Sequence, residues 1–476
     1  MRCSRKPRTR STVLIDLGRT TPAGCARTTF TSVGIVLLAA LAGAHAPATL
    51  WTKCYGGAAD DMAHTIVGDG SGGFVIAGLT GSSGAGGWDA WLLRLDSLGA
   101  IAWDRTYGGS ADEAGIFMSP VRRGGFIIAG YTTSFGSGGM DVYLVRTDSA
   151  GDTLWTRTYG SSLQDLSYVV HETADSGFVV AGYRDGPSEF VKGDLWLLRL
   201  DAAGETLWTR IYGGAGEEMA HAVEELPDGG FLLAGHTSTY GAGNKDLWLL
   251  RTDARGETLW TRVYGGTRHD VGYDIAPAPG GFLVTGYIDG PSSSIGGDLW
   301  LLRIDDSGDT LWTKRYGGSG AEVGLFMRAV SDSEWLITGS TASRGAGGDD
   351  VWLLKVNDHG DTVWTSTYGG RQFDGGGGFT ACPDGYAVVG YTSSFGAGGA
   401  DLYIIRTGPD TAAVTESWGS APRPPHRATV LGSRVVLPAG AALCDASGRS
   451  VLAASRPGVY YIVEHDRVPA KVVRVR

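Results

Sequence analysis

Cysteine is scarce in this sequence, at 5 of 476 residues. Removal of the N-terminal segment described below would leave only Cys54, Cys382 and Cys444, an odd and widely spaced set. Such a set neither builds a disulfide-stapled scaffold nor has the spacing of a zinc site. The histidines show no metal-binding spacing, and the chain has no Gly-x-Ser-x-Gly or His-Glu-x-x-His motif. We therefore assign no catalytic residue and no metal ligand from the sequence.

A net positive charge is also missing from most of the chain. The formal charge is −10 overall, yet residues 1–44 and 420–476 each contribute about +6, so the region between them is near −22. A surface of that sign repels phosphate backbones. We therefore expect no nucleic-acid partner.

The first 44 residues have the pattern of an export signal peptide. A basic stretch precedes an apolar run from Val33 to Ala42, and small residues follow it. Cleavage is expected after Ala44, because a later cut would place Pro47 beside the scissile bond. The apolar run is too short to cross a bilayer, although a membrane anchor is the alternative interpretation. We expect a protein that is secreted or held on the outer surface of a Gram-negative type of bacterium.

The sequence is rich in a tryptophan repeat whose copies lie 52 or 53 residues apart. The repeated residues are Trp51, Trp103, Trp155, Trp208, Trp260, Trp312 and Trp364. A period of about 40 to 50 residues is typical of radial or stacked β-repeats. Glycine is abundant, at 77 residues, without a Gly-x-y triplet, which indicates many tight turns and excludes collagen.

Each repeat contains four short strands. In the fourth repeat we expect strands at residues 219–224, 231–237, 246–252 and 258–264. Turns of the type Asp148-Ser-Ala-Gly151 place an Asp where its side chain bonds the turn backbone and a Gly where φ is positive. No stretch shows a helix-length apolar period of 3.6 residues. The repeat region is predicted to be all-β, with one four-stranded antiparallel sheet per repeat.

The position two residues after a recurring acid is small in every copy. These residues are Ala63, Gly115, Ser167, Ala220, Gly272, Gly324 and Gly376. Small side chains suit the crowded axis of a ring, so this strand is expected to be innermost and the tryptophan strand outermost.

The two ends of the repeat region complement each other. It begins with an isolated tryptophan strand at 50–55 and ends at 401–407 with a strand that lacks a tryptophan partner. The N-terminal strand can complete the last blade, which predicts a closed seven-bladed β-propeller over residues 45–407. An open solenoid would need capping repeats, which the sequence lacks.

Three recurring motifs carry a family resemblance. They are Trp-Thr-Arg-x-Tyr-Gly-Gly, Gly-Phe-x-x-Ala-Gly and Gly-Gly-x-Asp-x-Trp-Leu-Leu-Arg, and with them residues 49–407 resemble the Gly-rich, Trp-containing repeats of secreted bacterial β-propeller proteins. Asp148, Gly151 and Trp155 also resemble the tryptophan-docking motif of quinoprotein propellers, with an Asp-to-Gly gap one residue shorter. The second resemblance implies that each tryptophan docks one blade on the next. The eight blades and adjacent cysteine pair associated with quinone binding are missing, so no cofactor is carried over.

The C-terminal part has a different character. Residues 408–427 are rich in proline and are predicted to form an extended linker. Within residues 428–476, the segments that begin at Cys444 and Arg456 and the closing Lys471-Val-Val-Arg474 resemble the sorting domain of type IX secretion cargo. The resemblance implies a small β-sandwich recognised by the outer-membrane secretion machinery. This module lacks the usual Asn-Pro opening, and an accessory β-sandwich without a sorting role is the alternative.

One set of candidate ligand-binding residues is the acid at the start of each expected inner strand. The set is Asp61, Glu113, Asp165, Glu218, Asp270, Glu322 and Asp374. On a ring these carboxylates would surround one mouth of the central channel and could hold a cation or a basic ligand. We favour the alternative that each acid bonds its own Tyr-Gly-Gly backbone, because a feature of every blade usually serves the blade.

Glycine-rich loops before the third strands end in seven aspartates. They are Asp89, Asp141, Asp194, Asp246, Asp298, Asp350 and Asp401. Calcium-binding nonapeptide arrays share this composition but not this spacing, so calcium is the one ion considered and no cofactor is assigned.

Aromatic residues in these loops form the second candidate set. Phe135, Phe190, Tyr240 and Phe395 would lie on one face and could contact a carbohydrate or a peptide, or could instead pin each loop to its blade.

The expected function is that of a monomeric, non-catalytic binding or cell-surface interaction module with a glycan or protein ligand. The alternative is a secreted glycan-active hydrolase or lyase with its site on one propeller face. A deep pocket lined by unlike polar groups would favour the enzyme, and near-equivalent blades would favour the module.

Overall fold

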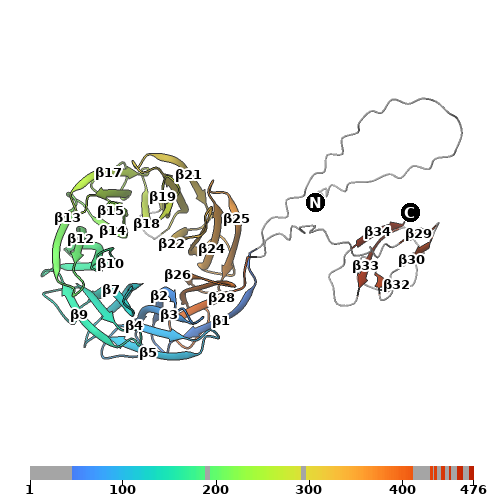
Figure 1. Cartoon of the computed structure of the whole chain (residues 1–476), viewed down its shortest axis with the longest axis horizontal. Helices are drawn as coiled ribbons and strands as arrows, with labels where there is room; N and C mark the ends of the chain where they lie inside the picture. Colours follow the sequence, from blue (N-terminus) through green and yellow to red (C-terminus); the bar gives the residue numbers. More distant parts are fainter. Residues whose placement is uncertain are drawn as a thin grey trace, which may run out of the picture. The chain divides into compact units, whose positions relative to one another are not determined.

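The repeats fold into a ring of seven sheets. The computed structural model describes residues 46–187, 193–290 and 296–410, together with the backbone of six strands between residues 429 and 475. Within the first three ranges the only regular elements are strands, which form seven four-stranded antiparallel sheets around a central axis (Figure 1). The predicted all-β, seven-bladed propeller is therefore confirmed.

Six blades consist of strands that follow one another along the chain, with the first strand innermost and the fourth outermost. Blade 1 contains β2 (Asp61–Gly68), β3 (Phe74–Thr80), β4 (Asp89–Leu95) and β5 (Ile101–Tyr107). Blade 2 contains β6 (Glu113–Pro120), β7 (Phe126–Thr132), β8 (Asp141–Thr147) and β9 (Thr153–Tyr159). Blade 3 contains β10 (Gln164–Glu172), β11 (Phe178–Gly186), β12 (Asp194–Leu200) and β13 (Thr206–Tyr212).

The next three blades repeat this order. Blade 4 contains β14 (Glu218–Glu225), β15 (Phe231–Thr237), β16 (Asp246–Thr252) and β17 (Thr258–Tyr264). Blade 5 contains β18 (His269–Ala278), β19 (Gly281–Gly290), β20 (Asp298–Ile304) and β21 (Thr310–Tyr316). Blade 6 contains β22 (Glu322–Ser331), β23 (Glu334–Thr341), β24 (Asp350–Asn357) and β25 (Thr362–Tyr368).

The seventh blade joins the two ends of the propeller. It contains β26 (Asp374–Cys382), β27 (Gly385–Thr392), β28 (Asp401–Thr407) and, as its outer strand, the N-terminal β1 (Thr49–Tyr55). β1 pairs antiparallel with β28, with Cys54 opposite Tyr403. The backbone N–H of Gly408 donates to the carbonyl of Ala48 at 2.7 Å, where a covalent turn would lie in another blade. The predicted closure by the N-terminal strand is confirmed.

Outer strands dock on the following blade through a repeated contact that we call the latch. In the latch between blades 3 and 4, the Trp208 ring packs on Gly256. A Cβ atom at residue 256 would lie 2.9 Å from Trp208 Cζ3, so only glycine lets the ring approach this closely. The φ of +78° at Gly256 also favours glycine. Tyr212 Oη donates to the Gly256 carbonyl at 2.6 Å. Arg210 covers the Trp208 ring at 5.6 Å and reaches Glu257 at 2.9 Å. The tryptophans therefore dock blade on blade, as the resemblance implies.

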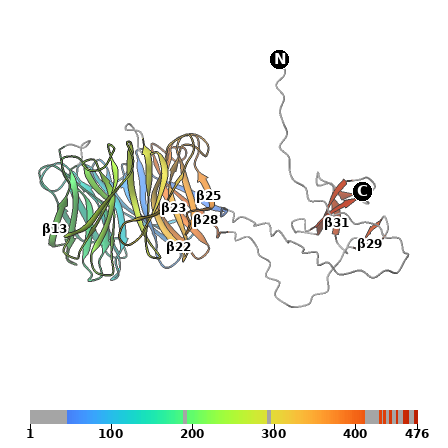
Figure 2. The same ribbon diagram turned by 90° about the horizontal axis from the view of Figure 1, so that it is seen from above.

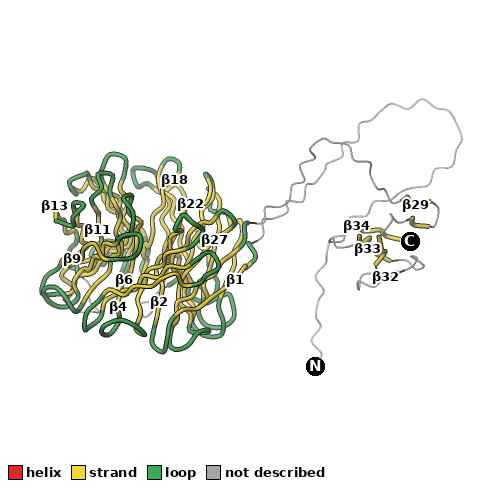
Figure 3. Tube along the Cα trace, turned by 60° about the horizontal axis from the view of Figure 1, so that its bottom comes forward, coloured by secondary structure: helices red, strands yellow, loops and turns green. Residues whose placement is uncertain are grey.

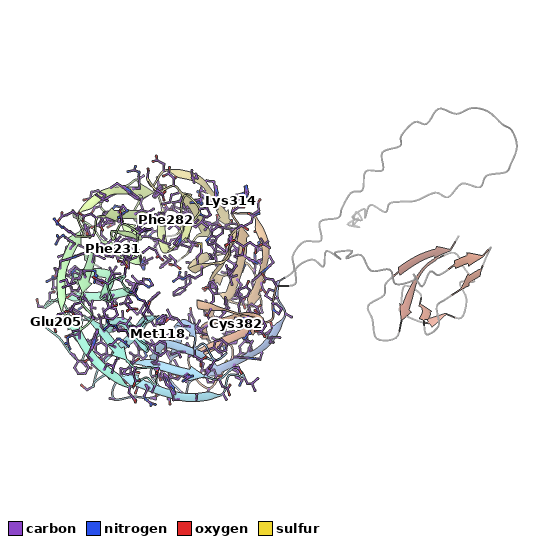
Figure 4. The ribbon with its side chains drawn as sticks, in the orientation of Figure 1. Met118, Glu205, Phe231, Phe282, Lys314 and Cys382 are labelled. Carbon is purple, nitrogen blue, oxygen red and sulfur yellow. The ribbon has the colours of Figure 1, made fainter. Side chains whose placement is uncertain are left out.

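The latch recurs around the ring. The tyrosine-to-turn hydrogen bond is repeated by Tyr55, Tyr107, Tyr159, Tyr264 and Tyr316. Glu205 and Lys314, labelled at the outer edge of the ring in Figure 4, belong to two further latches, where they pair with Arg157 and Asp361.

The junction of blades 6 and 7 lacks a latch, because β28 and β1 are not joined by a turn. Ser366 stands where the other six outer strands carry Arg or Lys, and Tyr368 Oη is buried without a hydrogen-bond partner among the described residues. Trp364 is only 4% exposed there and packs in a cluster that includes Ala46. This junction is held by packing and strand pairing.

The strands run between two faces of the propeller, as the edge-on view in Figure 2 and the loops in Figure 3 show. Antiparallel pairing places Glu113 opposite Thr132 and Thr132 opposite Asp141. The blade-to-blade loops and the loops before the third strands therefore share one face, the loop face. The turns that end the inner strands, such as residues 121–125, lie on the other, the turn face.

The C-terminal residues belong to a second unit, since the chain divides between Ala413 and Val414. Its strands are β29 (Thr429–Leu431), β30 (Arg434–Val436), β31 (Ala441–Cys444), β32 (Ser450–Val451), β33 (Gly458–Glu464) and β34 (Lys471–Val475). β29 pairs with β30, and the others form a sheet in the order β32-β31-β33-β34. The predicted signal peptide and most of the predicted linker lie outside the described residues. No described helix is long and apolar enough to span a membrane.

Candidate functional site

The seven acids at the start of the inner strands lie in the loop face and are buried. Asp61, Glu113, Asp165, Glu218, Asp270, Glu322 and Asp374 are each 0% exposed. Each accepts a hydrogen bond of 2.6–3.0 Å from the backbone N–H four residues earlier, in the segment that follows the latch tyrosine. The geometry is that of turn formation, the alternative favoured from the sequence, and a ligand-binding role for these residues stays a prediction.

Five of the seven aspartates that end the glycine-rich loops are buried, and Asp194 and Asp298 are half-buried. In five blades the carboxylate accepts a backbone N–H of that loop at 2.9 Å, from residues 85, 137, 243, 346 and 397. Burial raises the pKa of Asp89, Asp141, Asp194 and Asp350. Among the described residues no group of three or more His, Cys, Asp or Glu side chains is placed to hold a metal ion.

The loop aromatics stay accessible on the loop face. Phe135, Tyr240 and Phe395 are 45%, 45% and 46% exposed. Each rests on an aromatic ring of its third strand at a centroid distance of 5.9 Å, which pins the loop and leaves one ring face open. Phe190 lies outside the described residues.

The blades differ from one another in the central channel. The residue after each small inner-strand residue is His64, Ile116, Tyr168, His221, Tyr273, Leu325 or Gly377. The first six of these side chains are half-buried, although their neighbours along the inner strands are mostly buried, so they line the channel. Figure 4 shows inner-strand side chains directed toward the middle of the ring. Five different residue types thus occupy seven equivalent positions, in contrast to the repeated residues of the latches.

Three channel residues from neighbouring blades form what we call the aromatic wall. The His221 ring lies 4.7 Å from the Tyr168 ring and 4.5 Å from the Tyr273 ring, measured between centroids. Phe117 of blade 2 and Phe326 of blade 6 form the phenylalanine pair, with stacked rings 6.4 Å apart. Because blades 2 and 6 are not neighbours in the ring, this pair spans part of the channel.

Two cavities meet at the phenylalanine pair. One, the waist, has a volume of about 150 Å³ and is bounded by the aromatic wall, the phenylalanine pair, His64, Ile116 and Leu325. The other, the chamber, has a volume of about 340 Å³ and reaches toward the turn face, where Ser119, Arg328 and Thr380 help to line it. Phe117, His171 and Phe326 line both cavities, so they form the partition between them.

The charged groups of the channel compensate one another. Arg328 Nη1 lies 2.6 Å from Asp274 Oδ2, which also accepts the backbone N–H of Met327 at 2.7 Å. Burial, only partly offset by Arg328, raises the pKa of Glu224 to about 7. The channel therefore holds one matched ion pair and a carboxyl group that titrates near neutral pH.

The channel histidines are neutral at neutral pH. Burial lowers the pKa of His64 to about 4 and the pKa values of His171 and His221 to about 3. Ser119 Oγ donates to the Val170 carbonyl at 2.8 Å and lies 3.0 Å from His171 Nδ1. Because the hydroxyl proton is already used, Nδ1 carries a proton and donates, and Nε2 is an acceptor.

The neutral histidines predict a loss of stability in mild acid. A histidine whose folded pKa is below its unfolded value of about 6.5 is protonated first in the unfolded chain, so the free energy of unfolding falls as the pH falls below 6.5. Allowing for partial hydration, we expect about 1 kcal/mol per histidine at pH 5. Glu224 acts in the opposite direction, because its raised pKa stabilises the folded state below pH 7.

Melting curves at pH 7, 6 and 5 test this expectation. His221→Gln cannot be protonated, so its melting temperature should fall less between pH 7 and pH 5 than that of the parent. His359, whose side chain is 77% exposed, supplies the control His359→Gln, which should follow the parent. Parallel curves for His221→Gln and the parent would contradict the assignment.

Sequence reasoning missed the channel residues, because it searched for motifs and for features common to all blades. The signal was available as the variable positions that follow the invariantly small one. Recognising it requires the seven copies to be compared position by position and placed around a common axis. The pairing of Phe117 with Phe326 needs the ring itself.

No family model and no curated protein matches the chain. Solved structures are similar to it in fold. The Pan2 WD40 domain of Neurospora crassa is 10% identical with a TM-score of 0.47, over 75% of this chain and 94% of that one. Puromycin hydrolase is 14% identical with a TM-score of 0.44, over 88% of this chain and 62% of that one, so the chain spans less than two thirds of that enzyme. The β-propeller domain of the Trilobed protease from Pyrococcus furiosus is 8% identical with a TM-score of 0.41, over 75% of this chain and 96% of that one.

Proposed function

We propose that this chain is an exported, non-catalytic binding module whose ligand occupies the central channel. The observation that carries the proposal is the contrast between equivalent latches and unlike channel residues. Six latches repeat the same tyrosine-to-turn bond, whereas the aromatic wall and the phenylalanine pair occur once each and histidines line the waist from three blades only. A single ligand needs such an asymmetric, concave and mainly apolar lining.

The polar groups of the channel suit binding better than catalysis. Ser119 and His171 lie within hydrogen-bond distance, but Ser119 donates to a backbone carbonyl and no carboxylate is hydrogen-bonded to His171 among the described residues. The pair therefore lacks the base orientation that activates a serine nucleophile. Asp274 is fully engaged by Arg328 and by backbone N–H groups.

We further propose that the C-terminal unit serves export or attachment to the cell surface through the outer-membrane secretion machinery. The support is the sequence resemblance of residues 428–476 to sorting domains. Deleting residues 414–476 should leave the propeller in the periplasm of a host with that machinery, and the parent should reach the medium or the surface. Equal export of both chains would contradict this role.

A hydrolase or lyase acting on glycans is the second candidate, and one observation favours it. Glu224 is half-buried on the inner strand of blade 4, its pKa is raised to about 7, the property of a general acid in glycoside hydrolysis, and the charge of Asp274 acts on it.

A screen of the purified chain against glycan, peptide and small-molecule libraries, with product analysis of every bound compound, separates the two functions. A binding module should bind at least one ligand and release it unchanged. Turnover that is lost in Glu224→Gln, and kept in the control Glu225→Gln, would overturn the non-catalytic proposal and establish the hydrolase.

A further inference from the structure

The size of the waist limits what can enter it. Its volume is about 150 Å³. A closed apolar cavity of that volume accepts one benzene ring. The waist, which opens to the rest of the channel, therefore has room for a single six-membered ring.

The walls of the waist favour an aromatic ring. Tyr168, His221 and Tyr273 present ring surfaces from one side, and Phe117 and Phe326 present them from the other. Aromatic pairs with centroids 4.5–7 Å apart gain energy beyond the burial of their area. A flat aromatic guest can make such contacts with both sides at once.

One polar group at the waist, the His171 imidazole, favours a hydrogen-bond donor in the guest. His171 lines the partition between waist and chamber, and its Nδ1 is committed to Ser119. Its Nε2 is therefore left as an acceptor. An O–H group on the ring would satisfy this nitrogen, while a ring without a donor would leave it unpaired, at a cost.

Net charge is disfavoured in the guest. Asp274 is already matched by Arg328 at 2.6 Å, and the channel histidines facing the waist are uncharged. A charged group would lose its hydration without gaining a free counter-charge.

We propose that the waist binds a single uncharged aromatic ring that carries a hydroxyl group, the class whose simplest member is phenol. The ring lies between the aromatic wall and the phenylalanine pair, its hydroxyl donates to His171 Nε2, and a substituent can extend past the pair into the chamber. This inference rests on the proposed binding function and adds the ligand class.

The test is titration of the full chain with phenol, toluene, benzoate and benzylammonium by calorimetry. Phenol should bind with the lowest Kd, toluene about fivefold more weakly and both ions at least about tenfold more weakly. Leu325 lines the waist and not the chamber, so Leu325→Trp fills the waist and should weaken phenol binding at least about tenfold. The control Leu311→Trp changes a residue that is 55% exposed and should bind as the parent does.

Two further variants make the test specific. His171→Phe keeps a ring but removes the acceptor, so it should bind phenol no better than toluene. Ile116→Phe, which also fills the waist, replaces Leu325→Trp if that variant does not melt cooperatively.

The outcomes separate the ligand class from the binding function. Phenol binding that is unchanged in the waist-filling variants, or a stronger binding of either ion, would overturn the inference. Absence of phenol binding, with another screened ligand bound in the channel, would overturn the inference and leave the proposed function standing. Absence of binding by every compound screened would overturn both.

Discussion

A chain that begins at residue 58 is expected to lose the closed propeller. β1 supplies the outer strand of blade 7, pairing with β28 from Thr49 to Tyr55, and its Trp51 docks on the turn of blade 1 that contains Gly99. Without β1 the edge of β28 is unpaired and that latch is gone. We expect aggregation, or a melting temperature lower by more than about 10 °C.

The control is the same chain begun at residue 45, measured by light scattering and calorimetry under the same conditions. A synthetic peptide of residues 45–57, added in trans, should raise the melting temperature of the truncated chain. Identical melting of the two chains would show that the N-terminal strand does not close the ring.

Removing one latch tryptophan should produce the second largest effect. Trp208→Ala deletes a half-buried ring that packs on Gly256, lies under Arg210 and contacts Phe231 at a centroid distance of 6.0 Å. Large-to-small changes of this kind cost roughly 3 to 5 kcal/mol, and we expect about 3 kcal/mol because the ring is partly exposed. Urea titration of the parent and the variant measures the difference.

Two controls test that the loss comes from docking. Trp88→Ala removes a loop tryptophan that is 37% exposed and should cost under about 1 kcal/mol. From the partner side, Gly256→Ala should cost more than Gly280→Ala, because both glycines have positive φ but no atom lies within 4 Å of a Cβ at Gly280. A neutral effect of Trp208→Ala would mean that the ring is available to a ligand.

The fold could be predicted from the sequence because its determinants are local and repeated seven times. The strand at Phe231–Thr237 lies between turn residues, and its structural bounds equal the expected ones. Closure of the ring could be predicted because each end of the repeat region has only part of a blade, and the structure pairs these two ends. Even the role of glycine in the last hairpin of blades 1 to 6 could be anticipated, since Gly151 has a φ of +81° and faces Trp103.

The candidate site could not be predicted in the same way. Its residues come from inner strands of different repeats, such as Phe117 and Phe326, and no short motif connects them. Conversely, Asp61 and its equivalents were candidates because they recur in every blade. In the structure their side chains accept backbone hydrogen bonds and are fully buried. Repetition in a propeller indicates what holds the blades, and departure from it indicates where a ligand can be recognised.

The most direct test of a channel site compares two surfaces with one ligand. For a ligand obtained from the library screen, Kd would be measured for the parent, for Leu325→Trp in the channel and for the triple variant Phe135→Ser, Tyr240→Ser, Phe395→Ser on the loop face. We predict that Leu325→Trp weakens binding at least about tenfold and that the triple variant changes Kd less than about twofold. Loss of binding in the triple variant, with normal binding by Leu325→Trp, would place the site on the loop face and contradict the channel.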